Sequence, residues 1–188
     1  MIFFTSDLHI SHANIIKFCN RPFDSVEEMN RFIIDSWNKS IKPEDEVYFL
    51  GDFSFTISKR GARYFLHKLN GKKYFIKGNH DRTQYLNNFK NSGLIEWWKY
   101  DHSFSYDYNG KTYNFSLSHY PHYPSNSDII CVFGHIHGRR IETDGREIGI
   151  DVGVDNIGYE PISIETLMNY YYTEDVVSTA QARCNHPL

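Results

Sequence analysis

The stretch Ile2-Phe3-Phe4-Thr5-Ser6-Asp7-Leu8-His9 runs from a short apolar segment directly into an aspartate and a histidine. Later apolar segments end in a similar way, and the motifs that follow them are Gly51-Asp52, Gly78-Asn79-His80-Asp81, Ser118-His119 and Gly134-His135-Ile136-His137. Short apolar runs of this kind are typical of buried strands. In open α/β sheets, ligands bind outside the carboxyl ends of the strands. The pattern therefore predicts that five polar motifs meet at one sheet edge.

The N-terminal half alternates between strand and helix patterns. Strands are expected near 2–5, 46–50 and 73–77, and the helices expected between and after them lie near 13–18, 25–37, 62–69 and 83–89. Ser11 is the expected cap of the first helix, and Ser25-Val26-Glu27-Glu28 has the spacing of a capping box. Alternation of this type favours βαβ units and a largely parallel sheet.

The C-terminal half has a different pattern. The segments 104–108 and 112–117 flank Asn109-Gly110, which is a strong β-hairpin signal. Further strands are expected at 129–133 and 148–154, and Ser163 is expected to cap a last helix. The two halves are therefore expected to supply two sheets of one α/β sandwich.

Length and composition favour a single domain. The chain has 188 residues, a net charge of −3 and a pI of about 6.3. We expect one domain over residues 1–173 and a flexible polar tail over 174–188. There is no long basic run, so tight binding to duplex nucleic acid is not expected. No segment resembles a signal peptide or a membrane span. The three cysteines, Cys19, Cys131 and Cys184, form no paired motif, and a cytoplasmic location is expected.

The motif residues are of the types that bind metal ions. Asp7 and His9 are two residues apart, so on a regular strand they would share a face, and the same spacing relates His135 and His137. Asp52 has two carboxylate oxygens and is suited to a position between two cations. Each motif alone is compatible with ordinary turn chemistry. Their conjunction at strand ends predicts a site for two metals, a standard device for cleaving phosphate esters.

The order of these motifs resembles that of the calcineurin-like metallophosphoesterases, over Ile2 to about Thr166. More narrowly, the chain resembles the small bacterial and phage phosphoesterases of that superfamily. The resemblance to this group includes the stretches Thr5-Ser6-Asp7-Leu8-His9-Ile10-Ser11-His12-Ala13-Asn14-Ile15-Ile16, Asn20-Arg21-Pro22-Phe23 and Val152-Gly153-Val154-Asp155, the last leading to Pro161-Ile162-Ser163. It implies a four-layer αββα sandwich.

The resemblance also implies roles for individual residues. The ligands of the first metal would be Asp7, His9, Asp52 and His137. Asp52 would bridge to a second metal that is also held by Asn79, His119 and His135. His80 would not be a ligand; it would face the phosphate and assist the leaving group, and Asp81 would orient His80.

The chain departs from the family pattern in two places. Phe53-Ser54-Phe55 follows Asp52, where many relatives have a second aspartate, and Tyr120-Pro121 follows His119, where many have glycine. The candidate substrate contacts are His12, Arg21, Arg82, His122 and Arg139, and Tyr120 and Tyr123 are candidates for stacking on a base.

The expected activity is metal-dependent hydrolysis of a phosphate ester. A water or hydroxide that bridges the two metals would attack phosphorus directly. Imidazole, carboxylate and amide ligands suit manganese, which is the favoured metal, or iron, nickel or zinc. A small phosphodiester of nucleotide or cyclic-nucleotide type is the favoured substrate. The alternatives are a phosphomonoesterase that uses the same site, a nuclease, or a non-catalytic binding scaffold. The sequence leaves the oligomeric state open.

Overall fold

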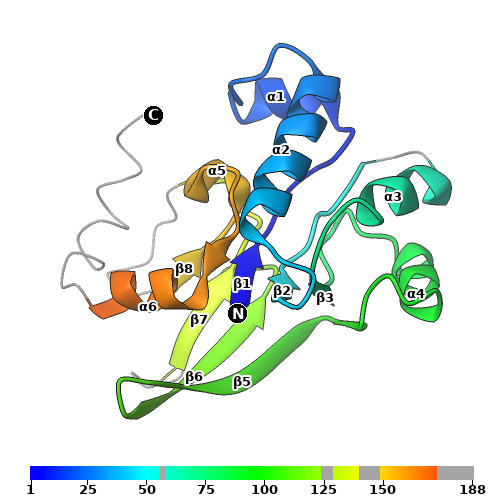
Figure 1. Ribbon diagram of the computed structural model, residues 1–188. Coiled ribbons are helices and arrows are strands. Elements are labelled where there is room, and N and C mark those ends of the chain that lie inside the picture. Colours follow the sequence, from blue (N-terminus) through cyan, green and yellow to red (C-terminus); the bar gives the residue numbers. More distant parts are fainter. Residues whose placement is uncertain (56–57, 124–128, 140–148, 173–188) are drawn as a thin grey trace.

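The computed structural model describes residues 1–55, 58–123, 129–139 and 149–172, which build two β-sheets packed against each other (Figure 1). The five-stranded sheet has the order β4-β3-β2-β1-β9, with the strands β1 (Ile2–Thr5), β2 (Glu46–Phe49), β3 (Lys72–Ile76), β4 (Trp97–Lys99) and β9 (Ile162–Ser163). Strands β1 to β4 are parallel, and β9 runs antiparallel to β1. The N-terminal half thus forms the predicted parallel sheet.

The four-stranded sheet has the order β5-β6-β7-β8, with the strands β5 (Asp101–Tyr108), β6 (Lys111–Ser118), β7 (Ile129–Phe133) and β8 (Ile150–Asp151). Strands β5 and β6 form the predicted hairpin, and β6, β7 and β8 are parallel. Asn109 and Gly110 have φ values of 50° and 78°. A tight hairpin turn of this type needs positive φ at both central residues, which Asn and Gly tolerate best.

Two apolar clusters follow from the alternation of side chains along the first sheet. Phe3 and Phe49 face the cluster that includes Ile33 and Trp37 of helix α2 (Val26–Ser40), whereas Phe4 faces the second sheet. The helices that contribute to the first cluster also include α1 (Ala13–Phe18), α3 (Lys59–Leu66) and α4 (Thr83–Asn91). Burial of each large apolar side chain contributes about 1.5–3 kcal/mol. The first sheet is therefore held from both faces.

The second cluster lies between the sheets. Phe4 packs with Phe115 and Phe104 at ring-centroid distances of 5.9 and 6.4 Å. Leu167 and Met168 of helix α6 (Ile164–Tyr172) complete this cluster, and the short helix α5 (Val154–Ile157) precedes β9. These two sheets and six helices confirm the predicted α/β sandwich within the described residues. The predicted tail lies outside the described residues.

Local capping signals agree with the structure at two of three positions. The Ser25 hydroxyl accepts a hydrogen bond from the Glu28 amide at 3.2 Å, and Ser163 accepts one from the Thr166 amide at 3.1 Å. The prediction for Ser11 was wrong. Ser11 has a φ of 66° and donates its amide to Asn30, while α1 begins after His12 without a side-chain cap. A capping residue normally has extended backbone, which the left-handed conformation of Ser11 prevents.

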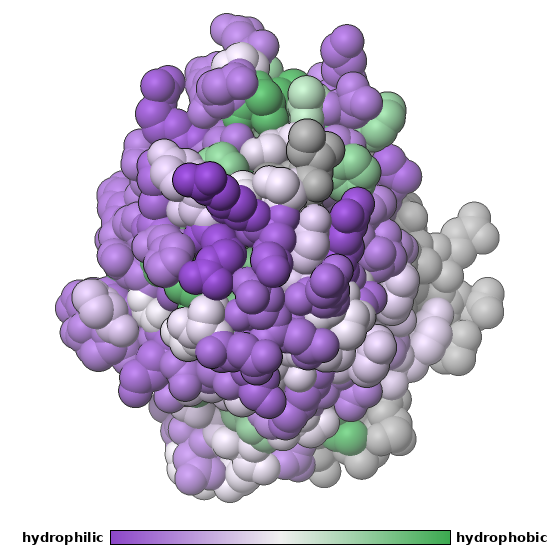
Figure 2. All heavy atoms as spheres, turned by 90° about the vertical axis from the view of Figure 1, so that its right-hand side faces the viewer, coloured by the Kyte–Doolittle hydropathy of each residue, from purple (hydrophilic) through white to green (hydrophobic). Residues whose placement is uncertain are grey.

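The face that carries α3 and α4 is mostly hydrophilic, with its apolar atoms gathered toward the upper end (Figure 2). Ala62 and Leu66 of α3 and Leu86 and Phe89 of α4 are buried toward the sheet. These helices are therefore amphipathic surface helices. In the described part of the chain, no helix combines the length and apolar character needed to cross a membrane.

Candidate metal centre

The five polar motifs lie at the carboxyl ends of parallel strands from both sheets. They follow β1, β2, β3, β6 and β7. A parallel bridge between Ser6 and Gly153, together with the hydrogen bond from the Val154 amide to the Ser6 carbonyl at 3.1 Å, joins the two sheets at this edge. The predicted convergence of the motifs therefore occurs.

The backbone at these motifs is left-handed rather than extended. Asp7, His9, Asp52, His135 and His137 have φ values of 58°, 51°, 59°, 74° and 53°. The shared face that a regular strand would give Asp7 and His9 therefore does not apply, because the strand ends before them. Non-glycine residues in this conformation cost about 1–3 kcal/mol each and cluster at functional sites. The strain is maintained by backbone hydrogen bonds from Asp7 to Gly51 at 2.9 Å and from His9 to Asp52 at 3.1 Å.

The Asp52 carboxylate occupies the middle of the cluster. Its Oδ2 atom lies 3.6 Å from His9 Nε2 and 3.6 Å from His119 Nε2, while its Oδ1 atom accepts a hydrogen bond from the His80 amide at 2.8 Å. Oδ1 is thus fixed by a backbone amide, whereas Oδ2 faces His9 and His119, the predicted ligands of different metals. This is the geometry expected of a carboxylate between two cations.

The side chains predicted to hold the first metal include buried polar atoms that lack hydrogen-bond partners in the described part of the chain. Asp7 Oδ2 accepts a hydrogen bond from the His135 amide at 2.8 Å, but Asp7 Oδ1 and His9 Nε2 are buried and unpaired among the described residues. Asp7 Oδ1 lies 3.9 Å from His9 Nε2 and 4.0 Å from His137 Nε2. Buried polar atoms that lack partners are costly in an apolar medium. A cation between these three atoms would satisfy them.

The side chains predicted to hold the second metal bring an amide oxygen and imidazole nitrogens close together. His119 Nδ1 lies 2.8 Å from the Leu50 carbonyl oxygen, so it carries the proton, and burial lowers the pKa of this histidine. His119 Nε2 is then a lone-pair atom, although it lies 2.8 Å from Asn79 Oδ1 and 3.2 Å from His135 Nδ1. Asn79 Oδ1 and His135 Nδ1 are 3.0 Å apart. Such an array has the donor chemistry of a cation site.

All seven predicted ligands therefore lie in one cluster, and their roles as ligands remain a prediction. Two subsets have atoms close enough to hold a single ion, namely Asp7 with His9 and His137, and Asp7 with Asp52 and His119. The donor set fits two divalent cations.

Burial shapes the protonation of the metal-free cluster. It raises the pKa of the Asp7 carboxyl to about 7 and lowers the pKa of His9 to about 2. Burial also lowers the pKa of His137, but hydrogen bonds with Asp155 and Cys19 outweigh it and raise that pKa to about 10. At pH 6 the metal-free protein therefore holds protons on Asp7 and on His137.

Metal uptake is expected to release more protons in acid than in base. Because a ligand must lose its proton to bind a metal, cations displace the His137 proton below pH 10 and the Asp7 proton below pH 7. Calorimetry of Mn²⁺ binding in buffers of different ionisation enthalpy is expected to show about one proton more released at pH 6 than at pH 8.5. Apparent affinity is expected to rise with pH. Equal proton release at both values would contradict the assignment of Asp7.

The side chain of Arg21, a candidate substrate contact, pairs with an internal carboxylate in the structure. Its side chain is buried, and its Nε and Nη2 atoms each lie 2.8 Å from the Asp155 carboxylate. Arg21 also donates to the carbonyl oxygens of Asp7 at 2.8 Å and Leu8 at 2.9 Å. Asp155 Oδ2 in turn accepts from His137 Nδ1 at 2.7 Å. The pair therefore orients His137 and fastens it to the loop that carries Asp7.

Asp155→Asn is expected to weaken the first metal site about 10–100-fold, the usual cost of losing a carboxylate behind a metal-binding histidine. The second site is expected to keep its affinity, because His119 and Asn79 do not contact Asp155. A two-site Mn²⁺ titration measures both affinities. Asp45→Asn is the matched control, since Asp45 is also buried but binds the N-terminal amine. An equal loss at both sites would show that Asp155 does not act through His137 alone.

Asp81, which was expected to orient His80, contacts the backbone instead. The buried Asp81 carboxylate accepts hydrogen bonds from the backbone amides of Gly78 and Asp52, both at 2.9 Å, and of Phe53 at 3.1 Å. It therefore shapes the Asp52 loop. The His80 side chain is 41 % exposed, and its Nε2 atom lies 3.9 Å from Asp52 Oδ2.

The other candidate substrate contacts divide into two groups. His12 lies beside His9, at a ring distance of 5.5 Å, and Tyr120 lies 4.6 Å from His135. In contrast, His122 turns to Ser116 Oγ at 2.9 Å, and the guanidinium of Arg82 lies over the Tyr85 ring at 5.4 Å. The local sequence around His122 and Arg82 does not reveal these partners.

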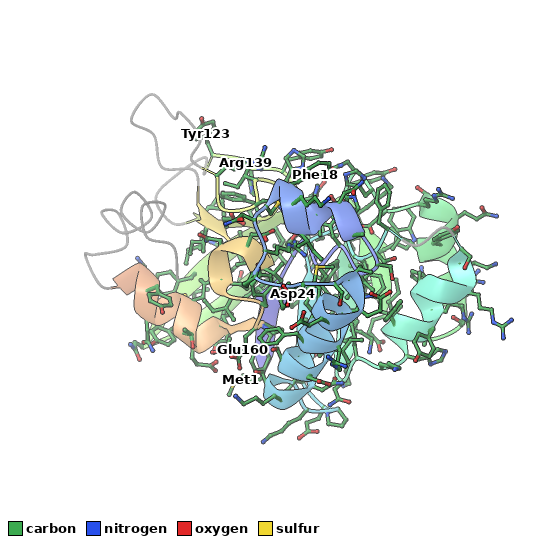
Figure 3. All side chains as sticks on the ribbon, turned by 90° about the horizontal axis from the view of Figure 1, so that it is seen from above. Met1, Phe18, Asp24, Tyr123, Arg139 and Glu160 are labelled. Carbon is green, nitrogen blue, oxygen red and sulfur yellow. The ribbon has the colours of Figure 1, made fainter. Side chains whose placement is uncertain are left out.

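Exposed side chains mark one side of the molecule. Phe18, Tyr123 and Arg139 lie on the side opposite Met1 and Glu160 (Figure 3). Phe18 and Tyr123 are exposed, and Phe18 contacts the ring of His12 at 6.3 Å. The side that carries Phe18 is therefore the side on which His12 borders the metal cluster.

Two residues near the cluster had no role assigned from sequence. In the sequence, Asp155 belongs only to a stretch that resembles small phosphoesterases, and no local spacing connects it with His137. Phe55 belongs to the segment after Gly51-Asp52 that departs from the family pattern. Its ring stacks on His12 at 4.2 Å and meets the His80 ring edge-on at 5.4 Å.

Comparison with known proteins agrees with this geometry. The chain is 38% identical to an uncharacterized protein of Methanocaldococcus jannaschii over 185 residues, which cover 95% of each chain. It is 26% identical to the Gene 66 protein of Mycobacterium phage L5, covering 94% of this chain and 98% of that protein. A protein of unknown function from Aquifex aeolicus superposes with a TM-score of 0.68 at 25% identity, covering 90% of this chain and 98% of the other.

A family model described as calcineurin-like phosphoesterase matches residues 1–173. This range includes every motif at the strand ends and both sheets. The chain therefore belongs to the calcineurin-like phosphoesterases and is a metal-dependent hydrolase of phosphate esters.

Proposed function

We propose that this protein hydrolyses phosphodiesters of nucleotide or cyclic-nucleotide type with two divalent cations, manganese being the favoured metal. The observation that carries the proposal is the placement of Asp52 Oδ2 at 3.6 Å from both His9 Nε2 and His119 Nε2. When bound, two cations at such a site supply Lewis acidity and a nucleophile at neutral pH.

In this proposal, one set of side chains would bind the metals and another would assist the leaving group. Asp7, His9 and His137 would hold the first cation, and Asn79, His119 and His135 the second, with Asp52 between them. His80 is half-exposed at the edge of the cluster, and its backbone amide is fixed by Asp52 Oδ1. Its ring would hold a proton at Nε2 for the leaving oxygen of the ester.

The charge of the site supports a diester over a monoester. A phosphomonoester carries up to two negative charges at neutral pH, whereas a diester carries one. Among the predicted contacts, Arg21 is buried in an ion pair with Asp155, so its charge is already balanced within the protein. His12 and His80 are two of the polar side chains that border the cluster.

The proposal is tested by metal analysis of the purified protein combined with a substrate panel. Bis(4-nitrophenyl) phosphate, 4-nitrophenyl phosphate, linear dinucleotides and cyclic nucleotides are compared at equal Mn²⁺ concentration. We expect two cations per chain and a higher kcat/KM for the diesters. A preference for the monoester would favour the phosphatase alternative, and cleavage of long single strands that weakens steeply with salt would favour a nuclease. Absence of hydrolysis despite full metal loading would favour a binding scaffold.

A further inference from the structure

The Phe55 ring is an exposed apolar surface beside the candidate metal centre. Its side chain is 47 % exposed, although its backbone is fixed by a hydrogen bond from the Phe55 amide to the Ile10 carbonyl at 2.8 Å and by a bridge between Ser54 and Ile10. The Phe55 side chain is therefore exposed at a position whose backbone is held in place. A single exposed apolar ring is ordinary on a protein surface, so the informative feature of Phe55 is its position against His12 and His80.

The orientation of the Phe55 ring is set by two histidines. It stacks on the His12 ring with centroids 4.2 Å apart and an interplanar angle of 15°, and it meets the His80 ring edge-on at 5.4 Å. His12 in turn lies 5.5 Å from the His9 ring. The His12–Phe55 stack is thus continuous with the histidines of the first metal site and with the proposed leaving-group acid.

We infer that the Phe55 ring, backed by His12, is the platform on which the nucleobase of the substrate stacks. The inference rests on the proposed function. Nucleotides carry a flat aromatic base at a short distance from phosphorus, and a base of this kind can stack on an exposed aromatic side chain. Stacking of a base on an aromatic side chain is tolerant of base identity and is worth about 1–3 kcal/mol. The platform would therefore select nucleotides as a class while admitting different bases.

The test compares AMP with ribose 5-phosphate, which lacks only the base. Calorimetry on the Mn²⁺-loaded protein measures both dissociation constants without requiring turnover. We expect the wild-type protein to bind AMP about tenfold more tightly than ribose 5-phosphate. Phe55→Leu is expected to reduce this ratio to about one while leaving the affinity for ribose 5-phosphate unchanged. Phe55→Trp is expected to preserve or increase the ratio.

Phe32→Leu is the matched control. Phe32 lies on α2 and its side chain is also 47 % exposed, but its ring packs against Phe23 and Tyr159. It is expected to keep the wild-type ratio. A ratio that survives in Phe55→Leu but disappears in Tyr120→Leu would place the base beside His135 and overturn the inference, as would a wild-type ratio of one. Hydrolysis of bis(4-nitrophenyl) phosphate is assayed separately. Its absence would count against the proposed function, whereas the AMP ratio alone decides the role of Phe55.

Discussion

Asp52→Asn is expected to abolish stable binding of both metals and to lower kcat/KM for a phosphodiester by more than about 100-fold. That is more than the usual cost of losing an outer partner of a metal ligand. The reason is that the two carboxylate oxygens of Asp52 have different partners. Oδ1 accepts the His80 amide at 2.8 Å, and Oδ2 faces His9 and His119. An amide has one oxygen, so its NH₂ group must face either the His80 donor or the cations.

The measurements are elemental analysis after dialysis and steady-state kinetics with added Mn²⁺. Asp45→Asn serves as the control for loss of a buried carboxylate and is expected to keep both metals. Because burial raises the pKa of Asp52, its charged form is disfavoured in the metal-free fold. The metal-free Asp52→Asn protein is therefore expected to melt no lower than the metal-free wild type. Full metal loading in Asp52→Asn would refute the bridging position.

His80→Ala is expected to lower kcat about 10²–10⁴-fold with an alkyl or nucleoside leaving group, while metal content stays unchanged. Alanine keeps the backbone amide that binds Asp52 Oδ1, and the seven predicted ligands do not include the His80 ring. The loss is expected to be much smaller with a 4-nitrophenolate leaving group, which needs no proton. The measurement is the ratio of mutant to wild-type kcat for the two classes of ester.

His67→Ala is a suitable control, because His67 is an exposed histidine at the end of α3. It is expected to retain wild-type rates with both esters. An equal loss in His80→Ala for nitrophenyl and nucleoside esters would mean that His80 stabilises the phosphoryl group rather than protonating the leaving oxygen. A loss of metal would instead place the His80 ring among the ligands.

Local sequence patterns predicted much of the fold because they reflect interactions between residues that are close together in the chain. The Asn109-Gly110 turn, the Ser25 cap and the alternation along β1 each depend on a few neighbouring residues. The local pattern at Ser11 was misleading, since its left-handed backbone is imposed by Asn30 and by the loop around it rather than by the helix that follows.

The sequence by itself determined which residues lie at the strand ends, and hence that carboxylates, an amide and histidines gather at one edge. Only the tertiary structure decided which of them face the cluster and which support it. Arg21 and Asp155 are 134 positions apart, and nothing local to either predicts that they pair behind His137. Likewise, Asp81 turned to backbone amides rather than to His80. Strand ends are set by local apolar periodicity, whereas the partner of a buried charge is set by whichever donors the packed sheets bring within reach.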